Sequence, residues 1–157
     1  MKAIRCTEWG GSELLVVAEV ELQPPAKGEV RIRVRAAGVN FPDLLMIQKK
    51  YQIQPPLPFT PGAEVAGEVL ALGEGVSHLK VGDRVASFCG LGGFAEEVNA
   101  PANATLPLPP GLPFNVAAAF TLAYGTSWHA VRDRAALQAG ETMLVLGAAG
   151  GVGLAAI

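Results

Sequence analysis

The chain has 157 residues, of which 50% are hydrophobic and 17% are charged, and its net charge at pH 7 is −2. This composition is typical of a folded globular protein, and the absence of a basic stretch excludes nucleic acid as an expected partner. No apolar run reaches the ~18 residues of a membrane span, and the charged start does not resemble a signal peptide. We therefore expect a cytoplasmic protein that does not enter a membrane.

Metal ligands are scarce in the sequence. Cys6 and Cys89 lie far apart and belong to no CxxC pair, so reduced thiols are their expected state. His78 and His129 are the only histidines, and they complete no recognisable ligand set for zinc. The sequence therefore predicts no metal site.

Short strands separated by glycine and proline fill the first two thirds of the chain. The clearest one, over residues 30–36, alternates apolar residues with Arg31, Arg33 and Arg35, so one face is expected to be buried and the arginine face solvated. Further strands are predicted over residues 2–7, 13–22, 63–72, 83–88 and 94–99. This pattern predicts a β-barrel-like or sandwich-like domain over about the first 110 residues.

A short helix interrupts these strands. Pro42 in the first turn, a preceding Asn40 as a possible cap and the apolar run that follows predict a helix from about Phe41 to Gln48. Asn40 and Asp43 would lie at its beginning, either as capping groups alone or with a functional role. In the proline-rich loop that follows, Tyr51 is the only titratable aromatic residue. The sequence leaves open whether its side chain packs in the core or takes part in a reaction.

The last part of the chain changes character. Helices are predicted over residues 114–120 and 127–137, followed by a strand at 143–146 whose unbroken apolar run fits burial on both faces. In the glycine-rich turn that follows, Gly147 suits a tight turn, Gly150 and Gly151 suit close approach to a pyrophosphate, and Gly153 suits packing of the next helix against the strand. The pattern predicts a dinucleotide-binding turn.

A complete nucleotide-binding unit needs at least ~30 residues for its strand, helix and second strand. Only one strand and the start of one helix are visible here. We therefore interpret the sequence as the amino-terminal part of a longer enzyme, and we expect residues 1–157 alone to be catalytically silent.

Five motifs, taken in order, carry a family resemblance. They are AAGVNFPDLL at 36–45, LPFTPGAEVAGEV at 57–69, VGDRV at 81–85, GGFAE at 92–96 and LGAAGGVGLAA at 146–156. With these motifs the chain resembles the zinc-independent quinone oxidoreductases of the medium-chain dehydrogenase/reductase superfamily, the group that includes zeta-crystallin. Gly38-Val39-Asn40 and Gly62-Ala63-Glu64 stand where zinc-dependent relatives carry a ligating Cys and a Gly-His-Glu sequence, which disfavours a catalytic zinc.

The resemblance implies a mixed α/β fold. A β-rich GroES-like catalytic domain is expected over residues 1–113. A helical bridge and the truncated start of a Rossmann domain are expected over 114–157, with the active site between the two domains. The resemblance also implies NADPH as hydride donor, a quinone or enone as the small-molecule substrate, and a homodimer.

The same resemblance implies the site residues. Tyr51 and Asn40 are the expected catalytic residues, with Tyr51 donating a hydrogen bond or proton to a developing oxyanion. The expected cofactor-binding residues are Asn40, Asp43, Leu44, Thr126, Gly147, Ala148, Ala149, Gly150, Gly151, Val152 and Gly153. Two alternatives remain open: an enoyl-thioester or 2-alkenal reductase of the same superfamily, and a non-enzymatic relative that keeps the cleft.

Overall fold

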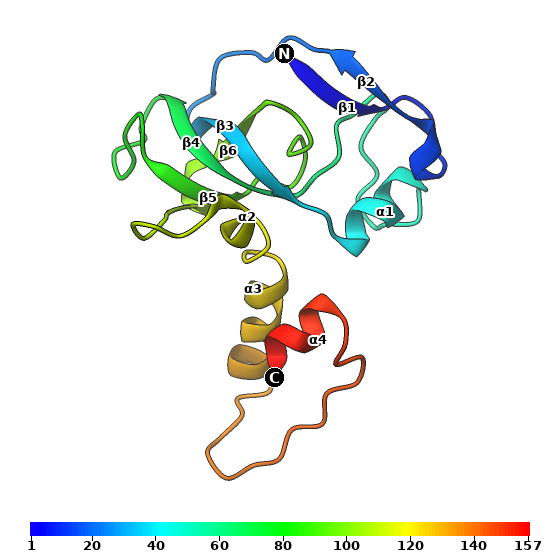
Figure 1. Cartoon of the computed structure of the whole chain (residues 1–157), viewed down its shortest axis with the longest axis vertical. Coiled ribbons are helices and arrows are strands. Elements are labelled where there is room, and N and C mark those ends of the chain that lie inside the picture. The colour runs from blue at the N-terminus through cyan, green and yellow to red at the C-terminus, as the bar shows by residue number, and fades with distance from the viewer. The chain divides into compact units, whose positions relative to one another are not determined.

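A computed structural model describes residues 1–157 and divides the chain into two compact units, Met1–Ala119 and Phe120–Ile157. The first unit contains every strand of the chain, and the second contains helices and a long connecting loop (Figure 1). The predicted β-rich mixed fold is therefore confirmed. No helix combines the length and the apolar character that crossing a membrane requires.

The main element of the first unit is a five-stranded antiparallel sheet with the strand order β6-β3-β4-β5-β7. Its strands are β3 (Glu29–Gly38), β4 (Glu64–Leu72), β5 (Arg84–Phe88), β6 (Glu97–Pro101) and β7 (Thr105–Pro107). As predicted, Val30 and Ile32 are fully buried while Arg33 and Arg35 are exposed; the third arginine of that face, Arg31, is only partly exposed. The buried valine and isoleucine side chains of β3, β4, β5 and β6 form the largest core cluster.

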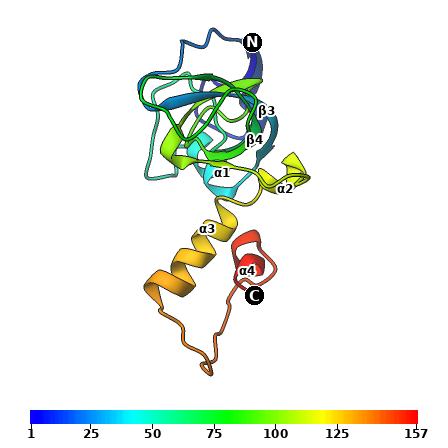
Figure 2. The same cartoon turned by 90° about the vertical axis from the view of Figure 1, so that its left-hand side faces the viewer.

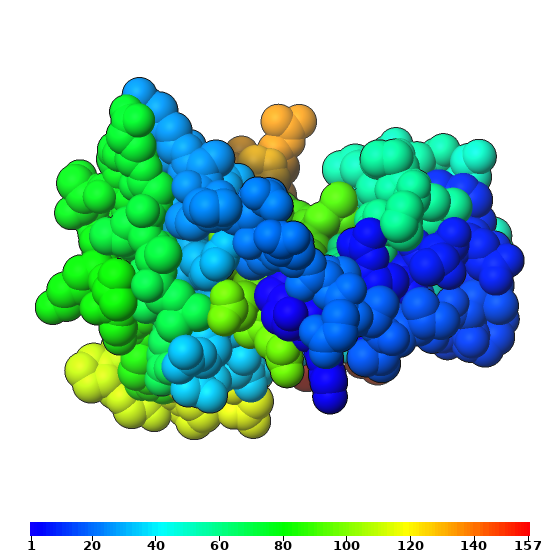
Figure 3. All heavy atoms as spheres, turned by 90° about the horizontal axis from the view of Figure 1, so that it is seen from above, coloured from blue at the N-terminus to red at the C-terminus, as the bar shows by residue number.

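A smaller sheet pairs β1 (Lys2–Cys6) with β2 (Leu15–Glu19), and a short 3-10 turn at Ser12–Leu14 precedes β2. Backbone hydrogen bonds between Cys6 and Phe59 join β1 to the proline-rich loop, and Figure 3 shows these two segments in contact. Cys6 and Phe59 also form a second core cluster with Met46 and Ile47. This cluster anchors the helix α1 (Phe41–Ile47), which confirms the predicted helix.

Near the carboxyl end of the first unit, the strands and the helix differ from the predicted ones. The strand predicted at 94–99 begins only at Glu97, and β7 was not predicted, because its proline-rich sequence resembles a loop. A 3-10 turn, Ala102–Ala104, connects β6 to β7. The helix predicted over 114–120 ends at Ala117. Ala117 of this short helix, α2 (Phe114–Ala117), and Ala118 just after it pack on alanines of β4 and β5.

The second unit is helical. Helix α3 (Ala123–Trp128) continues without a break into a π-helical segment, η3 (His129–Arg134), and both lie beside α4 (Gly151–Ala156), as Figure 2 shows. The helix predicted over 127–137 therefore begins four residues earlier and ends three residues earlier. The buried Ser127 hydroxyl donates a hydrogen bond to the Val152 carbonyl at 2.6 Å, which ties α3 to α4.

The strand predicted at 143–146 is wrong. These residues form no strand, and Leu144 and Leu146 are 83% and 85% exposed. The physical reason is that a strand is stable only when its backbone N–H and C=O groups pair with a neighbour, and the second unit contains no other strand. The apolar pattern was therefore insufficient by itself to produce the element.

Candidate functional site

Asn40 precedes the first turn of α1 and is held at both its backbone and its side chain. Its backbone N–H donates a hydrogen bond to Asp43 Oδ2 at 2.8 Å, and the Asp43 N–H donates to the Asn40 carbonyl at 3.0 Å. Its side-chain Nδ2 donates to Glu64 Oε1, also at 2.8 Å. Asn40 is therefore more than a capping residue, because its amide reaches a carboxylate on another element.

The two carboxyl groups that hold Asn40 are both buried. Asp43 is 3% exposed and Glu64 is 1% exposed. Burial raises the pKa of Asp43 above its ordinary value, and the nearby charge of Glu64 adds to this increase. The N–H groups of Asn40, Gly62 and Ala63 oppose the shift only in part. The site at the start of α1 is thus an unusual concentration of acidic groups in a dry environment.

Cys89 lies beside these two acids and is itself only partly buried. Its thiol donates hydrogen bonds to the Ala63 carbonyl at 3.3 Å and, more weakly, to the Gly62 carbonyl at 3.5 Å. Burial raises the pKa of Cys89 to about 12, with smaller contributions from the charges of Asp43 and Glu64. Both cysteines of the chain are free, as predicted. Because Cys89 remains protonated near neutral pH, it acts as a hydrogen-bond donor rather than a nucleophile.

The remaining predicted residues of the first unit lie along α1 and just after it. Leu44 is 40% exposed on the helix surface. The Tyr51 ring is half-buried and packs against the cluster of Cys6, Met46, Ile47 and Phe59. Its hydroxyl forms no hydrogen bond within the chain, which leaves it able to donate to a ligand. The structure thus confirms the packing of Tyr51, and its chemical role stays a prediction.

The predicted glycine-rich turn lies in the second unit. Gly147 has a φ of +73°, a conformation that favours glycine, and its carbonyl accepts a hydrogen bond from the Gly150 N–H at 3.0 Å. A Cβ on Gly153 would lie 2.3 Å from the Gly147 oxygen, so Gly153 packs against the turn itself and not against a strand. A Cβ on Gly151 would meet nothing within 4 Å. The turn is therefore closed on its inner side and open where Gly151 begins α4.

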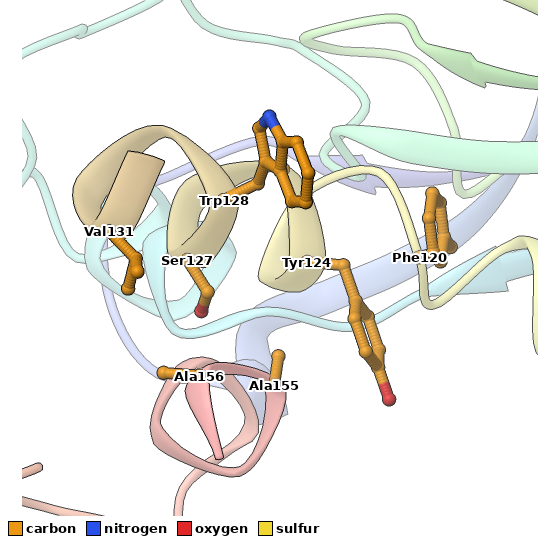
Figure 4. A pocket seen from close by; sticks show the side chains of 8 residues that line it. Phe120, Tyr124, Ser127, Trp128, Val131, Ala155 and Ala156 are labelled. Atoms are coloured by element: carbon orange, nitrogen blue, oxygen red, sulfur yellow. The ribbon is translucent and has the colours of Figure 1, made fainter. Parts of the chain in front are cut away.

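Thr126 lies in α3 with an exposed side chain. A cavity lies between the glycine-rich turn and the continuous helix formed by α3 and η3, and Ser127 and Val131 line it on the helix side. A second cavity, of about 410 Å³, opens between that helix and α4 (Figure 4). Its lining residues include Phe120, Tyr124, Ser127, Trp128, Val131, Ala155 and Ala156. Sequence reasoning missed this cavity, since a helical aromatic pattern by itself usually indicates packing.

The features described so far can be compared with those of known protein families. Residues 26–110 match the alcohol dehydrogenase GroES-like domain family. Because this match covers more than half of the chain, the chain belongs to that family, and the predicted GroES-like fold is confirmed.

Comparison with individual named proteins is more specific than the family match. Over 99% of its length the chain is 43% identical to the quinone oxidoreductase of Rattus norvegicus, of which it covers 48%. The chain is therefore similar over almost its whole length to a protein named as a quinone oxidoreductase, as the motifs indicated. The chain spans about half the length of the curated relatives and solved structures that it matches.

Solved structures with several different names are similar to this fold. The human synaptic vesicle membrane protein VAT-1 homolog-like protein matches with a TM-score of 0.96 and 36% identity, over 99% of this chain and 50% of that chain. The quinone oxidoreductase from Thermus thermophilus, solved also as a complex with NADPH, matches with a TM-score of 0.85 and 38% identity, over 99% and 48%. The CurK enoyl reductase matches with a TM-score of 0.90 and 30% identity, over 99% and 49%.

Proposed function

We propose that this chain forms the amino-terminal half of an NADPH-dependent oxidoreductase that reduces a quinone or another conjugated carbonyl without zinc. The observation that supports this most strongly is the likeness, over 99% of the chain, to a quinone oxidoreductase whose structure was solved with NADPH. The fold class and membership of the alcohol dehydrogenase GroES-like domain family are shown; the activity, the cofactor, the substrate, the absence of zinc and the role of each residue are the proposal.

The glycine-rich turn fits the diphosphate of the cofactor. Gly147 closes the turn, and the open space at Gly151 lets backbone N–H groups face a phosphate without a side chain in the way. Ala148, Ala149 and Val152 complete the segment that would contact the diphosphate, and Gly153 keeps it close to α4. NADPH supplies a hydride when it is bound.

The residues of the first unit would orient the reacting groups. Asn40 presents a fixed side chain that can hydrogen-bond to the nicotinamide carboxamide, while Asp43 holds the Asn40 backbone in place and Leu44 offers apolar surface on the same helix. We assign Thr126 a contact with the cofactor ribose. Tyr51 would donate a hydrogen bond or a proton to the oxygen of the reduced acceptor.

The donor chemistry of the acidic cluster supports the absence of zinc. Asn40 and Glu64 satisfy each other by a hydrogen bond, and position 63 is an alanine. No three His, Cys, Asp or Glu side chains come together as a group that could hold a metal ion. A conjugated carbonyl is already polarised, so positioning of donor and acceptor supplies the main effect.

We further propose the organisation that the resemblance implies. Residues 1–113 would form the catalytic domain and 114–157 the bridge and start of the nucleotide-binding domain. The full-length protein, meaning this chain extended to the length of its relatives, would be a cytoplasmic homodimer that binds only small molecules.

NADPH oxidation by the full-length protein tests this function. We expect turnover with a quinone such as 1,4-benzoquinone, and no turnover by residues 1–157 alone. Turnover that depends on added zinc, or no oxidation of NADPH with any acceptor, would reject the proposal. The Tyr51→Phe variant separates packing from chemistry, because it keeps the ring in its cluster and removes only the hydroxyl; unchanged turnover would remove Tyr51 from the mechanism.

A second candidate is reduction of a carbon–carbon double bond next to a thioester or aldehyde. The similarity to the CurK enoyl reductase favours it, and the same hydride donor and binding residues would serve. Rates on crotonyl thioester and on a quinone, measured with the same enzyme preparation, distinguish the two reactions. A higher kcat/KM on the thioester would replace the first proposal by the second.

A further inference from the structure

Glu64 is a fully buried acid that the proposed mechanism does not use. It begins β4, and its side chain packs directly against Gly38 of β3. A Cβ on Gly38 would lie 2.4 Å from Glu64 Oε1 and 2.8 Å from Glu64 Cγ. Glycine at position 38 therefore leaves the space that this carboxylate occupies beside Asn40.

The contact between Glu64 and Asn40 has a defined polarity. A carboxylate only accepts hydrogen bonds, whereas an asparagine amide has one end that donates and one that accepts. Because Asn40 Nδ2 donates to Glu64 Oε1 at 2.8 Å, the amide oxygen Oδ1 is directed away from Glu64; it serves the capping box of α1 with one lone pair, which leaves the other for a ligand. The backbone of the same residue is fixed by Asp43, so the two ends can exchange only by rotation about the Cβ–Cγ bond, which would break the hydrogen bond to Glu64.

We propose that Glu64 is a positioning residue that fixes the orientation of the Asn40 amide and so makes Asn40 Oδ1 a hydrogen-bond acceptor for the cofactor. The complementary group is the amino group of the nicotinamide carboxamide. This inference rests on the proposed function, since it takes NADPH as the ligand of Asn40. Glu64 itself does not touch the ligand and acts through Asn40.

Paired substitutions test the polarity of this contact. In Glu64→Gln the new amide can either donate or accept, so the Asn40 amide is free to adopt both orientations. In the double variant Asn40→Asp with Glu64→Gln, the new amide donates to one oxygen of the new carboxylate, and the other oxygen again faces outward. Glu68→Gln is the matched control, because Glu68 lies on the same strand but pairs with Arg35 at 2.9 Å.

The first readout is the preference of the full-length protein for NADPH over its reduced 3-acetylpyridine analogue, in which a methyl group replaces the amino group. A single hydrogen bond predicts that wild type and Glu68→Gln bind NADPH roughly five- to tenfold more tightly than the analogue. We expect Glu64→Gln to lose this preference and the double variant to recover it. Equal preference in wild type and Glu64→Gln would overturn the proposal.

The second readout uses the 157-residue chain without nucleotide. In NMR spectra the Asn40 side-chain amide protons should exchange with water roughly five- to tenfold more slowly than those of the exposed Asn103, because a hydrogen bond protects them. Glu64→Gln should reduce this protection and Glu68→Gln should not. Unchanged protection in Glu64→Gln would show that Glu64 does not set the orientation.

The two readouts separate the possible failures. If the wild-type full-length protein binds neither nucleotide, the proposed function and the ligand assigned to Asn40 both fail, while the exchange measurement still decides the role of Glu64. If Glu64→Gln does not fold, as circular dichroism would show, Asn40→Ala takes its place in the binding experiment. Asn40→Ala removes the acceptor while Glu64 is intact, and a retained preference for NADPH in that variant would overturn the proposal.

Discussion

The acidic cluster around Asn40 and the glycine-rich turn at 147–153 are built in opposite ways. In the cluster, Glu64 lies 24 residues from Asn40 and Cys89 a further 25, and all of their contacts depend on the packing of β3, β4 and α1. In the turn, the backbone hydrogen bonds and the close approaches at its glycines join residues at most six positions apart, although Ser127 also reaches the Val152 carbonyl. A long-range site is rigid because a core surrounds it, whereas a local turn keeps its shape through glycine conformation.

The largest expected effect is the low reactivity of the Cys89 thiol in the acidic cluster. With the pKa of Cys89 raised to about 12, its thiolate fraction at pH 8 should be roughly a thousandfold below that of an ordinary thiol. Alkylation of Cys89 by iodoacetamide, followed by mass spectrometry, should therefore be very slow in the folded chain and fast in denaturant. Rapid alkylation under native conditions would show that the cluster opens readily.

A second prediction compares two glycines. Gly38→Ala places a methyl group 2.5 Å from the Ala118 carbonyl oxygen and against Glu64, so we expect a loss of about 3 kcal/mol in the free energy of unfolding. Gly151→Ala is the matched change in the turn, where nothing lies within 4 Å. Because alanine favours helix over glycine, this variant should be neutral or gain up to about 1 kcal/mol.

Urea unfolding followed by circular dichroism measures both variants. The comparison requires that the slope of the transition stays the same, so that a shift in midpoint reports stability. If Gly38→Ala were as stable as the wild type, the space between β3 and Glu64 would be wide enough for a methyl group, which would contradict the close contact at Gly38.

Ser127 tests whether the second unit has its own tertiary contact. Ser127→Ala removes the hydrogen bond to the Val152 carbonyl and leaves that carbonyl without its partner, which should cost about 1 kcal/mol. We expect faster amide hydrogen exchange in α4 and unchanged exchange in β3 and β4. An equal increase in both units would mean that they unfold as one.

The smallest effect concerns pH. The pKa of Asp43 is higher in the folded chain than in the unfolded chain, so its contribution to stability is present below the unfolded pKa and is lost as the pH rises through the folded pKa. Asp43→Asn keeps an acceptor for the Asn40 N–H and removes the charge. The variant should therefore gain stability relative to wild type as the pH rises from about 3 to neutral.

Asp83→Asn is the control for this experiment. Asp83 also accepts a hydrogen bond from a backbone N–H, that of Lys80, in the turn before β5. We expect no comparable rise in its relative stability over the same pH range. A pH-independent difference between Asp43→Asn and wild type would contradict a raised pKa for Asp43.

The sequence by itself was sufficient wherever a local pattern and long-range packing agreed. The alternation of β3 and the proline and asparagine before α1 predicted their elements, because side-chain period and turn chemistry are local properties. Five motifs in order were also enough to indicate the family. The positions of the glycines predicted a closed turn, since only glycine adopts the φ of Gly147 without strain.

Only the tertiary structure decided the rest. The same apolar run that predicted a strand at 143–146 forms none, because a strand needs a partner and the second unit has no other. No spacing rule linked Asn40 to Glu64 or Cys89, which meet because β3, β4 and the segment after β5 pack together. Burial and hydrogen-bond direction arise from these distant contacts, and they determine the direction in which the pKa of Asp43 shifts and the orientation of the Asn40 amide.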